Sequence, residues 1–358
     1  MVADDEGEPV GAGSPGSMRA AVYRGPGVVE VVEVDVPRPG PGEVLVEVDA
    51  CGICGTDLHS VLEGWGRPDS IGGHEWSGRV VEVGDGVDGV AVDDLVVGGP
   101  DPGCGSCRPC EDRRPSLCAD RNSPGVAPFQ GAFADYVRIR ADRVVPVPTG
   151  LDAHTAAFAE PLAVSLHAIT QAAVASGDRV LVTGGGPIGA GIVAVLAAAG
   201  HEVVVSEPSP MRAELALALG AARVLDPGEL TLPPMPNDVH EAPFDRVFEC
   251  SGVRAAIETG LGQLRRGGRF VVVGTGLDFP RLDINRVLLN ELEITGAFNY
   301  DEGGFPAALD LLASGALPTD ALIEADAVGL DTMLGAMQAL AAGRVAGKVL
   351  VRPGAGHD

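Results

Sequence analysis

The stretch 180-VLVTGGGPIGAG-191 decides the fold of this chain. It begins with an apolar run typical of a strand, continues through a glycine turn, and ends in small apolar residues with helical spacing. Three of its glycines have the G-x-G-x-x-G spacing, which lets the backbone approach a pyrophosphate at the positive end of a helix. The stretch therefore predicts a dinucleotide site whose contacts are Gly184, Gly186, Pro187, Ile188 and Gly189.

The sequence around this motif makes the prediction specific, because a chain with 51 glycines produces such a spacing by chance. Apolar strands alternate here with helices, which is typical of a doubly wound parallel sheet. A glycine turn that serves only packing is the alternative. The predicted strands are RVLVTG, EVVVSE, FDRVFECSG and GRFVVVG, and the predicted helices are PIGAGIVAVLAAAG, SPMRAELALALG and VRAAIETGLGQL.

The second predicted strand ends in Glu207. An acidic side chain at this point can accept hydrogen bonds from the adenosine ribose hydroxyls and repels a 2′-phosphate. Glu207 therefore predicts NAD as the cofactor in preference to NADP. Arg212, in the next helix, is the alternative, since its guanidinium would favour a phosphate.

Composition limits the possible partners. The chain has 358 residues, enough for two domains, and its 50 acidic and 25 basic residues give a net charge of -25. Such a surface repels phosphate backbones and anionic lipids, so neither nucleic acid nor a membrane is an expected partner. A salt-adapted surface is a further interpretation of the acidity. The single lysine, Lys348, is interpreted as a consequence of genome composition.

Local composition and hydrophobic pattern divide the sequence into three parts. Residues 1–17 are acidic, rich in Gly, Ser and Pro, and unlike a signal peptide, so they predict a disordered tail. Residues 18–151 show short Val-rich alternations and predict a β-rich unit, to which the final strand of residues 301–358 would pair back. Residues 152–300 carry the strand–helix alternation. Seven cysteines without a signal peptide predict free thiols or metal ligands and a cytoplasmic location.

A four-cysteine lobe lies at about residues 100–120. Its spacing is C-x2-C-x2-C-x7-C, with Gly and Pro between the cysteines. Four thiolates so close can complete a tetrahedral shell around zinc with no open position, which is a structural site. An iron–sulfur cluster is the alternative. The predicted ligands are Cys104, Cys107, Cys110 and Cys118.

A second group of metal-binding residue types is split between 51-CGICGTDLH-59 and 72-GGHEWSG-78. Cys54, His74 and a carboxylate such as Glu75 would give the mixed three-ligand set of a catalytic zinc, with one position left for water or substrate. Asp57 suits a hydrogen bond to the far nitrogen of a ligand histidine.

Two neighbouring residues suit proton transfer. Thr56 offers a hydroxyl near the metal that could pass a proton, and His59 could relay it to solvent. The alternative for His59 is an ordinary solvated loop histidine. Cys51 and Cys54 also form a C-x-x-C pair, which would be redox-active in another setting. Since that pair normally opens a helix and here follows a strand, Cys51 is interpreted as a small buried residue.

Together these motifs resemble the zinc-dependent medium-chain dehydrogenase/reductase family, in the order GICGTDLH, GGHEWSG, four-cysteine lobe and GGGPIG. The resemblance extends from Met18 to about Pro353. It implies an α/β protein with a GroES-like β-rich catalytic domain, a Rossmann doubly wound domain and an active site between them. It also implies a proton relay through Thr56 and His59, and two zinc ions per chain, one catalytic and one structural.

The third catalytic ligand separates the branches of this family. Alcohol dehydrogenases proper carry a cysteine where AEPLAVSLHA places Glu160, and a glutamate there resembles the polyol and butanediol branch, which includes sorbitol dehydrogenase. The later ITGAFNY is also similar to sorbitol dehydrogenase. The resemblance thus implies Cys54, His74 and Glu160 as ligands, with Glu75 as an exchanging carboxylate. Threonine dehydrogenases share GICGTD but differ around Glu160.

The activity that the resemblance implies is hydride transfer between NAD and a secondary alcohol to give a ketone. The alcohol would be a polyol, a vicinal diol, a cyclitol or a sugar derivative. Threonine or a simple alcohol is the alternative substrate, and a zinc-free quinone reductase or a non-catalytic zinc-ribbon interaction protein is the alternative class. The family also implies a homodimer or homotetramer joined at sheet edges, for which GRFVVVG is a candidate strand. Candidate pocket walls are Trp65, Phe129 and Tyr300.

Overall fold

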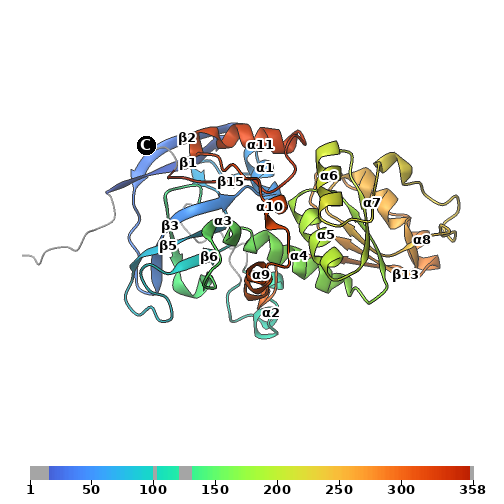
Figure 1. Cartoon of the computed structure of the whole chain (residues 1–358), viewed down its shortest axis with the longest axis horizontal. Coiled ribbons are helices and arrows are strands. Elements are labelled where there is room, and N and C mark those ends of the chain that lie inside the picture. Colours follow the sequence, from blue (N-terminus) through green and yellow to red (C-terminus); the bar gives the residue numbers. More distant parts are fainter. Residues whose placement is uncertain (1–15, 100–102, 121–130, 355–358) are drawn as a thin grey trace, which may run out of the picture.

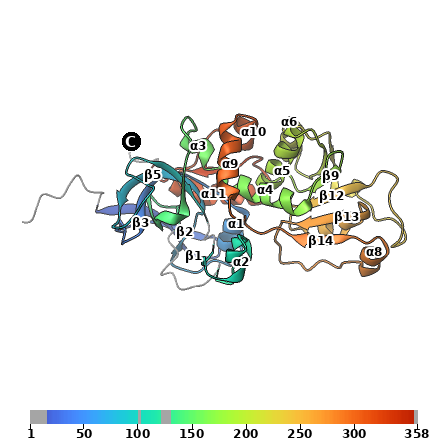
Figure 2. The same ribbon diagram turned by 90° about the horizontal axis from the view of Figure 1, so that it is seen from below.

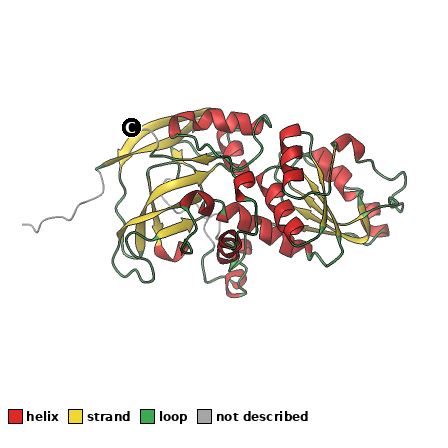
Figure 3. Cartoon of the chain, in the orientation of Figure 1, coloured by secondary structure: helices red, strands yellow, loops and turns green. Residues whose placement is uncertain are grey.

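The computed structural model describes residues 16–99, 103–120 and 131–354. Within these ranges a β-rich part and an α/β part lie next to each other, with α4 and α9 near their junction (Figure 1). Figure 3 shows the strands of the two parts as separate groups. Phe129 and nearly all of the predicted tail lie outside the described ranges, while β1 already begins at Ser17.

The predicted doubly wound sheet is confirmed. All its strands are parallel, and their order places β9 and β12 side by side at the centre, where the chain reverses the direction in which it adds strands. A reversal of this kind opens a crevice at the carboxyl ends of the strands, where dinucleotides bind. In spatial order the strands are β11 (Arg223–Leu225), β10 (Glu202–Ser206), β9 (Arg179–Thr183), β12 (Phe244–Glu249), β13 (Leu264–Val272) and β14 (Glu293–Gly296).

Both faces of this sheet are buried, as its nearly continuous apolar strands require. Val180 and Val182 of β9 belong to the core shared with Ile192 of α5, whereas the intervening Leu181 belongs to the core shared with Ile257 of α7. This alternation follows from the two-residue period of a strand. The sheet therefore has helices on each side, as Figure 2 shows from below.

The position of β13 corrects one prediction. The GRFVVVG strand was expected at a sheet edge, but β13 pairs with β12 on one side and with β14 on the other. The prediction is wrong because the following segment, residues 293–296, adds one more parallel strand. Among the described strands, β14 forms this edge of the sheet.

The β-rich part contains two antiparallel sheets. The predicted return of the final strand is confirmed, since β15 pairs with β3. The larger sheet has the order β15 (Leu350–Val351), β3 (Glu43–Gly52), β5 (Glu75–Val83), β6 (Leu95–Gly98) and β8 (Val144–Pro146), with β7 (Tyr136–Arg140) paired to β3. The smaller sheet has the order β2 (Val28–Asp35), β1 (Ser17–Gly25) and β4 (Ser70–Ile71).

Helices connect and cover these sheets. In the part of the chain that the structure describes, no helix has the length and apolar character that crossing a bilayer requires. The α-helices are α1 (Gly55–Leu62), α2 (Arg108–Glu111), α3 (Ala153–Ala156), α4 (Ala159–Ala172), α5 (Pro187–Ala198), α6 (Pro210–Ala218), α7 (Arg254–Leu261), α8 (Ile284–Leu289), α9 (Gly304–Ala313), α10 (Thr319–Leu322) and α11 (Met333–Ala341). Short 3₁₀ helices lie at Pro115–Leu117, Ala141–Arg143, Pro227–Glu229 and Leu330–Thr332.

Candidate metal centre and nucleotide site

Strand pairing brings the first candidate ligands together. The end of β3 lies beside the start of β5, with Gly52 opposite Glu75. Cys54 follows β3 after one intervening residue and is the N-cap of α1, while His74 directly precedes β5. The metal-binding atoms of Cys54, His74 and Glu75 all lie within 4.8 Å of one another. A side chain at position 52 would collide with the carboxylate, since a Cβ there would lie 2.2 Å from Glu75 Oε2, and this explains the glycine.

Glu160 lies in the first turn of α4, near but outside this set of three. It is 4% exposed, and burial together with the charge of Glu75 raises its pKa to about 8. Neighbouring carboxylates and thiolates in a poorly solvated site repel one another, so the site favours a cation or a proton. The structure thus places both carboxylates that the sequence considered as ligands in one buried cluster, with Glu75 nearer to Cys54 and His74.

The sequence analysis missed Lys348, which pairs with Glu75. The ammonium Nζ donates to Glu75 Oε1 at 2.8 Å, to Oε2 at 2.5 Å and to the carbonyl of Ile53 at 3.0 Å. Lys348 is 1% exposed and Glu75 is fully buried. The available signal was that this is the only lysine of the chain, and it stands two positions before the returning strand. Its interpretation as genome composition overlooked this role.

Asp57 and Thr56 flank the imidazole of His74. Asp57 Oδ1 lies 3.8 Å from His74 Nδ1, and its Oδ2 accepts a hydrogen bond of 2.9 Å from the backbone amide of Cys54. Thr56 Oγ1 lies 3.5 Å from His74 Nε2. Burial lowers the pKa of His74, but the charges of Cys54 and Asp57 outweigh this effect and raise the pKa well above its usual value. The imidazole therefore stands in strongly negative surroundings.

Cys51 and His59, the first and last residues of the stretch 51–59, differ in exposure. Cys51 is fully buried within β3, opposite Trp76, and burial raises the pKa of its thiol well above the usual value. A buried thiol of this kind is neither a nucleophile nor a ready redox partner. His59, by contrast, lines a cavity that also touches the α/β part, and its ring stacks on Trp65.

The four cysteines of the lobe converge on one point. Their sulfur atoms all lie within 4.8 Å of one another, with 3.5 Å between those of Cys107 and Cys110 and 3.8 Å between those of Cys107 and Cys118. Four thiolates about 2.3 Å from a central zinc are about 3.8 Å apart in a tetrahedron. Backbone amides also point at the sulfurs, as in the 3.3 Å contact from Cys107 N to Cys104 Sγ. The lobe therefore fits one zinc ion.

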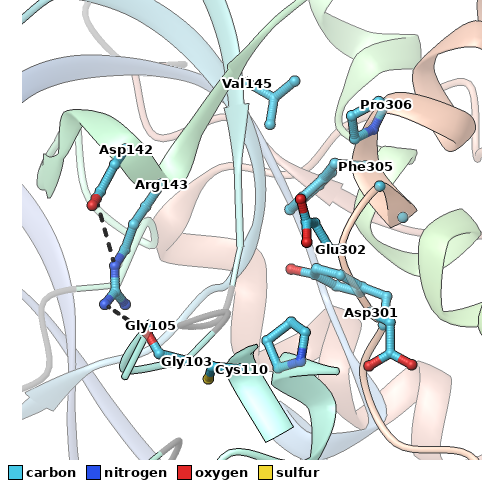
Figure 4. A pocket seen from close by; sticks show the side chains of 14 residues that line it. Gly103, Gly105, Cys110, Asp142, Arg143, Val145, Asp301, Glu302, Phe305 and Pro306 are labelled. Carbon is cyan, nitrogen blue, oxygen red and sulfur yellow. Dashed lines mark hydrogen bonds and ion pairs between the residues drawn. The ribbon is translucent and has the colours of Figure 1, made fainter. Parts of the chain in front are cut away.

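Ion pairs attach this lobe to the chain that follows β14. Arg113 donates two hydrogen bonds to Glu302, at 2.7 and 3.2 Å, and Ser116 Oγ donates to Asp301 at 2.6 Å. A cavity of about 350 Å³ lies beside this junction. Figure 4 shows Asp301 and Glu302 on one side of it and Asp142 and Arg143 on the other, with Cys110 at the base.

Two of the predicted pocket walls can be located. Tyr300 lines the same cavity, packs edge-on against Phe305 at 4.9 Å between ring centroids, and is 6% exposed. A Cβ at Gly99 would lie 2.7 Å from Tyr300 Oη and 3.0 Å from Glu160 Cγ, so both side chains pack against this glycine. Trp65 lies against His59, lines a different cavity together with Thr56 and His74, and is 48% exposed.

The glycine turn after β9 has the geometry that its sequence predicts. Gly184 has a φ of 94°, in the left-handed region that glycine adopts without strain. A Cβ at Gly189 would lie 2.0 Å from the carbonyl oxygen of Gly184, so close packing of strand and helix requires that glycine. Gly186 caps α5, and Pro187 and Ile188 form its first turn. The amides at this helix start are thereby turned toward the carboxyl edge of the sheet, ready for a pyrophosphate.

Glu207 and Arg212 lie beside this turn but face different partners. Glu207 Oε2 accepts a hydrogen bond of 2.6 Å from Gly185 N, and its Oε1 accepts one of 2.8 Å from Ser209 N, which fixes the carboxylate next to the turn. The Arg212 guanidinium donates instead to the carbonyls of Val345, at 3.3 Å, and Leu340, at 3.1 Å. The predicted contact of Arg212 with a cofactor stays a prediction.

The residues present fit the two metal ions that their chemistry suggests. The site at the end of β3 offers sulfur and nitrogen from the half-buried Cys54 and His74 and carboxylate oxygen from the buried Glu75, with an excess of acidic groups over the one ammonium. The lobe offers four sulfurs. Combined with the glycine turn of a doubly wound sheet, these sites define a zinc-binding, nicotinamide-dependent dehydrogenase.

Comparison with known proteins gives the family. The family model for the alcohol dehydrogenase GroES-like domain matches residues 40–149, and that for zinc-binding dehydrogenase matches residues 187–314. The chain therefore belongs to the zinc-binding alcohol dehydrogenase family. This membership confirms the resemblance drawn from the motifs and the predicted fold class, a GroES-like domain with a Rossmann domain.

Three similar proteins illustrate the range of the family. Sorbitol dehydrogenase of Bacillus subtilis (strain 168) is 32% identical over 318 residues, which cover 86% of this chain and 90% of that protein. L-threonine 3-dehydrogenase of Pyrococcus abyssi (strain GE5 / Orsay) is 36% identical over 335 residues, covering 90% and 94%. A structure described as a zinc-binding dehydrogenase of Sinorhizobium meliloti 1021, bound to NADP, has 31% identity and a TM-score of 0.83, covering 94% of this chain and 99% of that one.

Proposed function

We propose that this protein oxidises a secondary alcohol of a polyol, vicinal diol, cyclitol or sugar derivative to a ketone, reversibly and with NAD. The observation that carries the proposal is the cluster formed by Cys54, His74 and the two buried carboxylates of Glu75 and Glu160, with a glutamate where alcohol dehydrogenases proper have a cysteine. The similarity of this chain to sorbitol dehydrogenase, whose name identifies a polyol substrate, supports the same substrate class.

The chain's own residues suit this reaction. Cys54 and His74 would hold the zinc together with Glu75 or Glu160, and a zinc ion so held would act as a Lewis acid toward an alcohol oxygen. Asp57, on the Nδ1 side of His74, leaves Nε2 for the metal. Thr56 and His59 are three residues apart on α1 and so share a face, along which the alcohol proton can move toward solvent.

For the cofactor we propose NAD. The buried carboxylate of Glu207 lies beside the glycine turn, where it would accept hydrogen bonds from ribose hydroxyls and repel a 2′-phosphate. Arg212, the nearest candidate for a phosphate contact, already donates to two carbonyls. The solved relative from S. meliloti is bound to NADP, so both cofactors belong in the test.

L-Threonine is the second candidate substrate. It is favoured by one observation: the P. abyssi threonine dehydrogenase has 36% identity to this chain, against 32% for the sorbitol dehydrogenase. Threonine is itself a secondary alcohol, so the same metal-binding group would serve it. A pocket for threonine must accept an ammonium group and a carboxylate group. A polyol has neither of these charged groups.

The test is the absorbance of reduced nicotinamide during turnover with NAD and with NADP. Sorbitol, butane-2,3-diol, inositols, simple primary alcohols and L-threonine are the substrates to compare. The proposal expects the highest kcat/KM for a polyol, diol or cyclitol with NAD. A preference for threonine or for primary alcohols would contradict the substrate class, and a preference for NADP would contradict the assignment to Glu207.

The remaining proposals concern assembly and location. We propose a homodimer or homotetramer in which β14 is the paired edge, because Ile294 on β14 and Phe279, which lines the same cavity as Ile294, are exposed apolar side chains. We propose a cytoplasmic location, because all seven cysteines are free of disulfides, as a reducing compartment would keep them. We also propose residues 18–151 with 301–358 as the catalytic domain and 152–300 as the nucleotide domain. Sedimentation of the protein and of its Ile294→Lys variant tests the assembly.

A further inference from the structure

The end of α1 folds back on itself around His59. Glu63 stands at the C-cap of the helix, four residues after His59 and therefore on the same face. Gly64 follows with a φ of 82°, in the left-handed region that lets the chain reverse. The backbone amide of Trp65 then donates to the carbonyl of His59 at 3.2 Å. The short sequence between His59 and Trp65 thus returns the indole to the histidine ring.

Two side chains hold the imidazole in this arrangement. His59 Nδ1 lies 2.9 Å from Glu63 Oε2, and the rings of His59 and Trp65 are stacked with 4.6 Å between centroids and 15° between planes. An ionised carboxylate only accepts hydrogen bonds, so Nδ1 must carry the hydrogen in this contact. Nε2 is then the nitrogen that remains to exchange a proton.

Two of the other charged groups near His59, Arg254 and Glu258, pair with each other. His59 and Glu63 line a cavity of about 740 Å³, and across it lie Arg254, Glu258 and Asp278 of the α/β part. Arg254 Nε donates to Glu258 at 2.8 Å. Glu63 is therefore the acidic group that contacts the ring itself, as the 2.9 Å distance shows.

The elements packed against α1 add few charges. α11 consists of residues without titratable side chains. β2 contributes Glu30, which accepts a hydrogen bond of 2.8 Å from Arg24, and Glu33 and Asp35 at its far end. These groups belong to the neighbouring strand, whereas Glu63 and Trp65 contact the imidazole directly.

We propose that Glu63 and Trp65 are positioning residues that hold His59 as its Nδ1–H tautomer, so that Nε2 is its single site of proton exchange at the cavity. The inference rests on the proposed function, in which the hydride of the alcohol carbon goes to NAD and the hydroxyl proton leaves along α1. Nε2 would accept that proton, the imidazolium would be stabilised by the carboxylate of Glu63, and Nε2 would return the proton to water.

The first experiment reads the tautomer and does not depend on activity. Two-bond ¹H–¹⁵N correlations of the full-length protein with labelled histidines, assigned with a His59→Asn variant, show which nitrogen of neutral His59 carries the hydrogen. We expect Nδ1–H in the unmodified protein and in Glu63→Gln, whose amide oxygen still accepts. We expect a change to Nε2–H in Glu63→Ala. Nε2–H in the unmodified protein, or no change in Glu63→Ala, would overturn the proposal.

The second experiment links the tautomer to turnover. With the best substrate found, Glu63→Ala and Trp65→Ala should lower kcat about tenfold or more while the KM for NAD changes little, since general acid–base steps contribute about 10²–10⁴-fold. The matched control is Glu241→Ala, an exposed glutamate in a different cavity, which should leave kcat unchanged. An unchanged kcat in Glu63→Ala would overturn the role in proton transfer. If no alcohol is oxidised at all, the proposed function fails, while the tautomer experiment still decides the positioning of His59.

Discussion

Replacement of Lys348 by methionine should greatly reduce the stability of the protein. Methionine matches the length of the lysine stem and fits an apolar interior, so the main change is the loss of the charge. In the native protein the ammonium uses all three of its hydrogens, two toward Glu75 and one toward the carbonyl of Ile53. The variant would leave the carboxylate of Glu75, which is fully buried, without a counter-ion.

The expected magnitude follows from that burial. Breaking a buried ion pair from one side costs about 3–5 kcal/mol, because the remaining charge is no longer compensated. Since whole proteins unfold with about 5–15 kcal/mol, such a loss is a large share of the total. If the cost comes from the unpaired carboxylate, the double variant Glu75→Gln with Lys348→Met should be more stable than Lys348→Met alone. We expect the recovery to be at least about 1 kcal/mol.

Urea unfolding followed by the fluorescence of Trp76 is the appropriate assay. Trp76 comes directly after Glu75, is 3% exposed, and becomes the only tryptophan in a Trp65→Phe background. Metal content should be measured on each variant, because Glu75 is also a candidate ligand. A loss below about 1 kcal/mol for Lys348→Met, or a double variant no more stable than the single one, would refute the reasoning.

Three further outcomes are expected. Cys110→Ser should lower the zinc content from two ions per chain to one, as measured by elemental analysis; two retained ions would contradict the assignment of the lobe. Glu207→Ala should raise kcat/KM for NADP relative to NAD by about tenfold or more, because it removes the charge that repels a 2′-phosphate; an unchanged ratio would contradict this role. Asp57→Asn should weaken zinc binding at the other site about 10–100-fold in a chelator competition, because the partner of His74 Nδ1 loses its charge. An unaltered affinity would exclude Asp57 from this role.

The sequence was most informative where the deciding contacts are local. The glycine turn, the helix after it and the cysteine lobe each lie within one short stretch, so spacing alone indicates their geometry. Glu160 is far from the other ligands in sequence and needed the family resemblance. Lys348 could not be foreseen by spacing, because 273 residues separate it from Glu75 and only the pairing of β15 with β3 brings them together.

Side-chain direction was equally hidden in the sequence. Arg212 lies where a phosphate contact was conceivable, but its guanidinium donates to the carbonyls of Leu340 in α11 and of Val345 after it, more than a hundred positions further along the chain. The sheet edge was misplaced for a similar reason. The apolar GRFVVVG looks like any other strand, and only the added β14 shows that both its sides are occupied.

The burial of Lys348 also determines how the protein can be handled. Succinimidyl esters and aldehyde cross-linkers react with exposed ε-amines, and the only ε-amine of this chain is 1% exposed and bound to a carboxylate. We expect the folded surface to resist labelling or fixation at lysine. Coupling to a support would use the carboxylates, which are plentiful, because the one exposed thiol, Cys104, belongs to the zinc-binding lobe. The appearance of lysine reactivity would in turn signal that the β3–β15 pairing had opened.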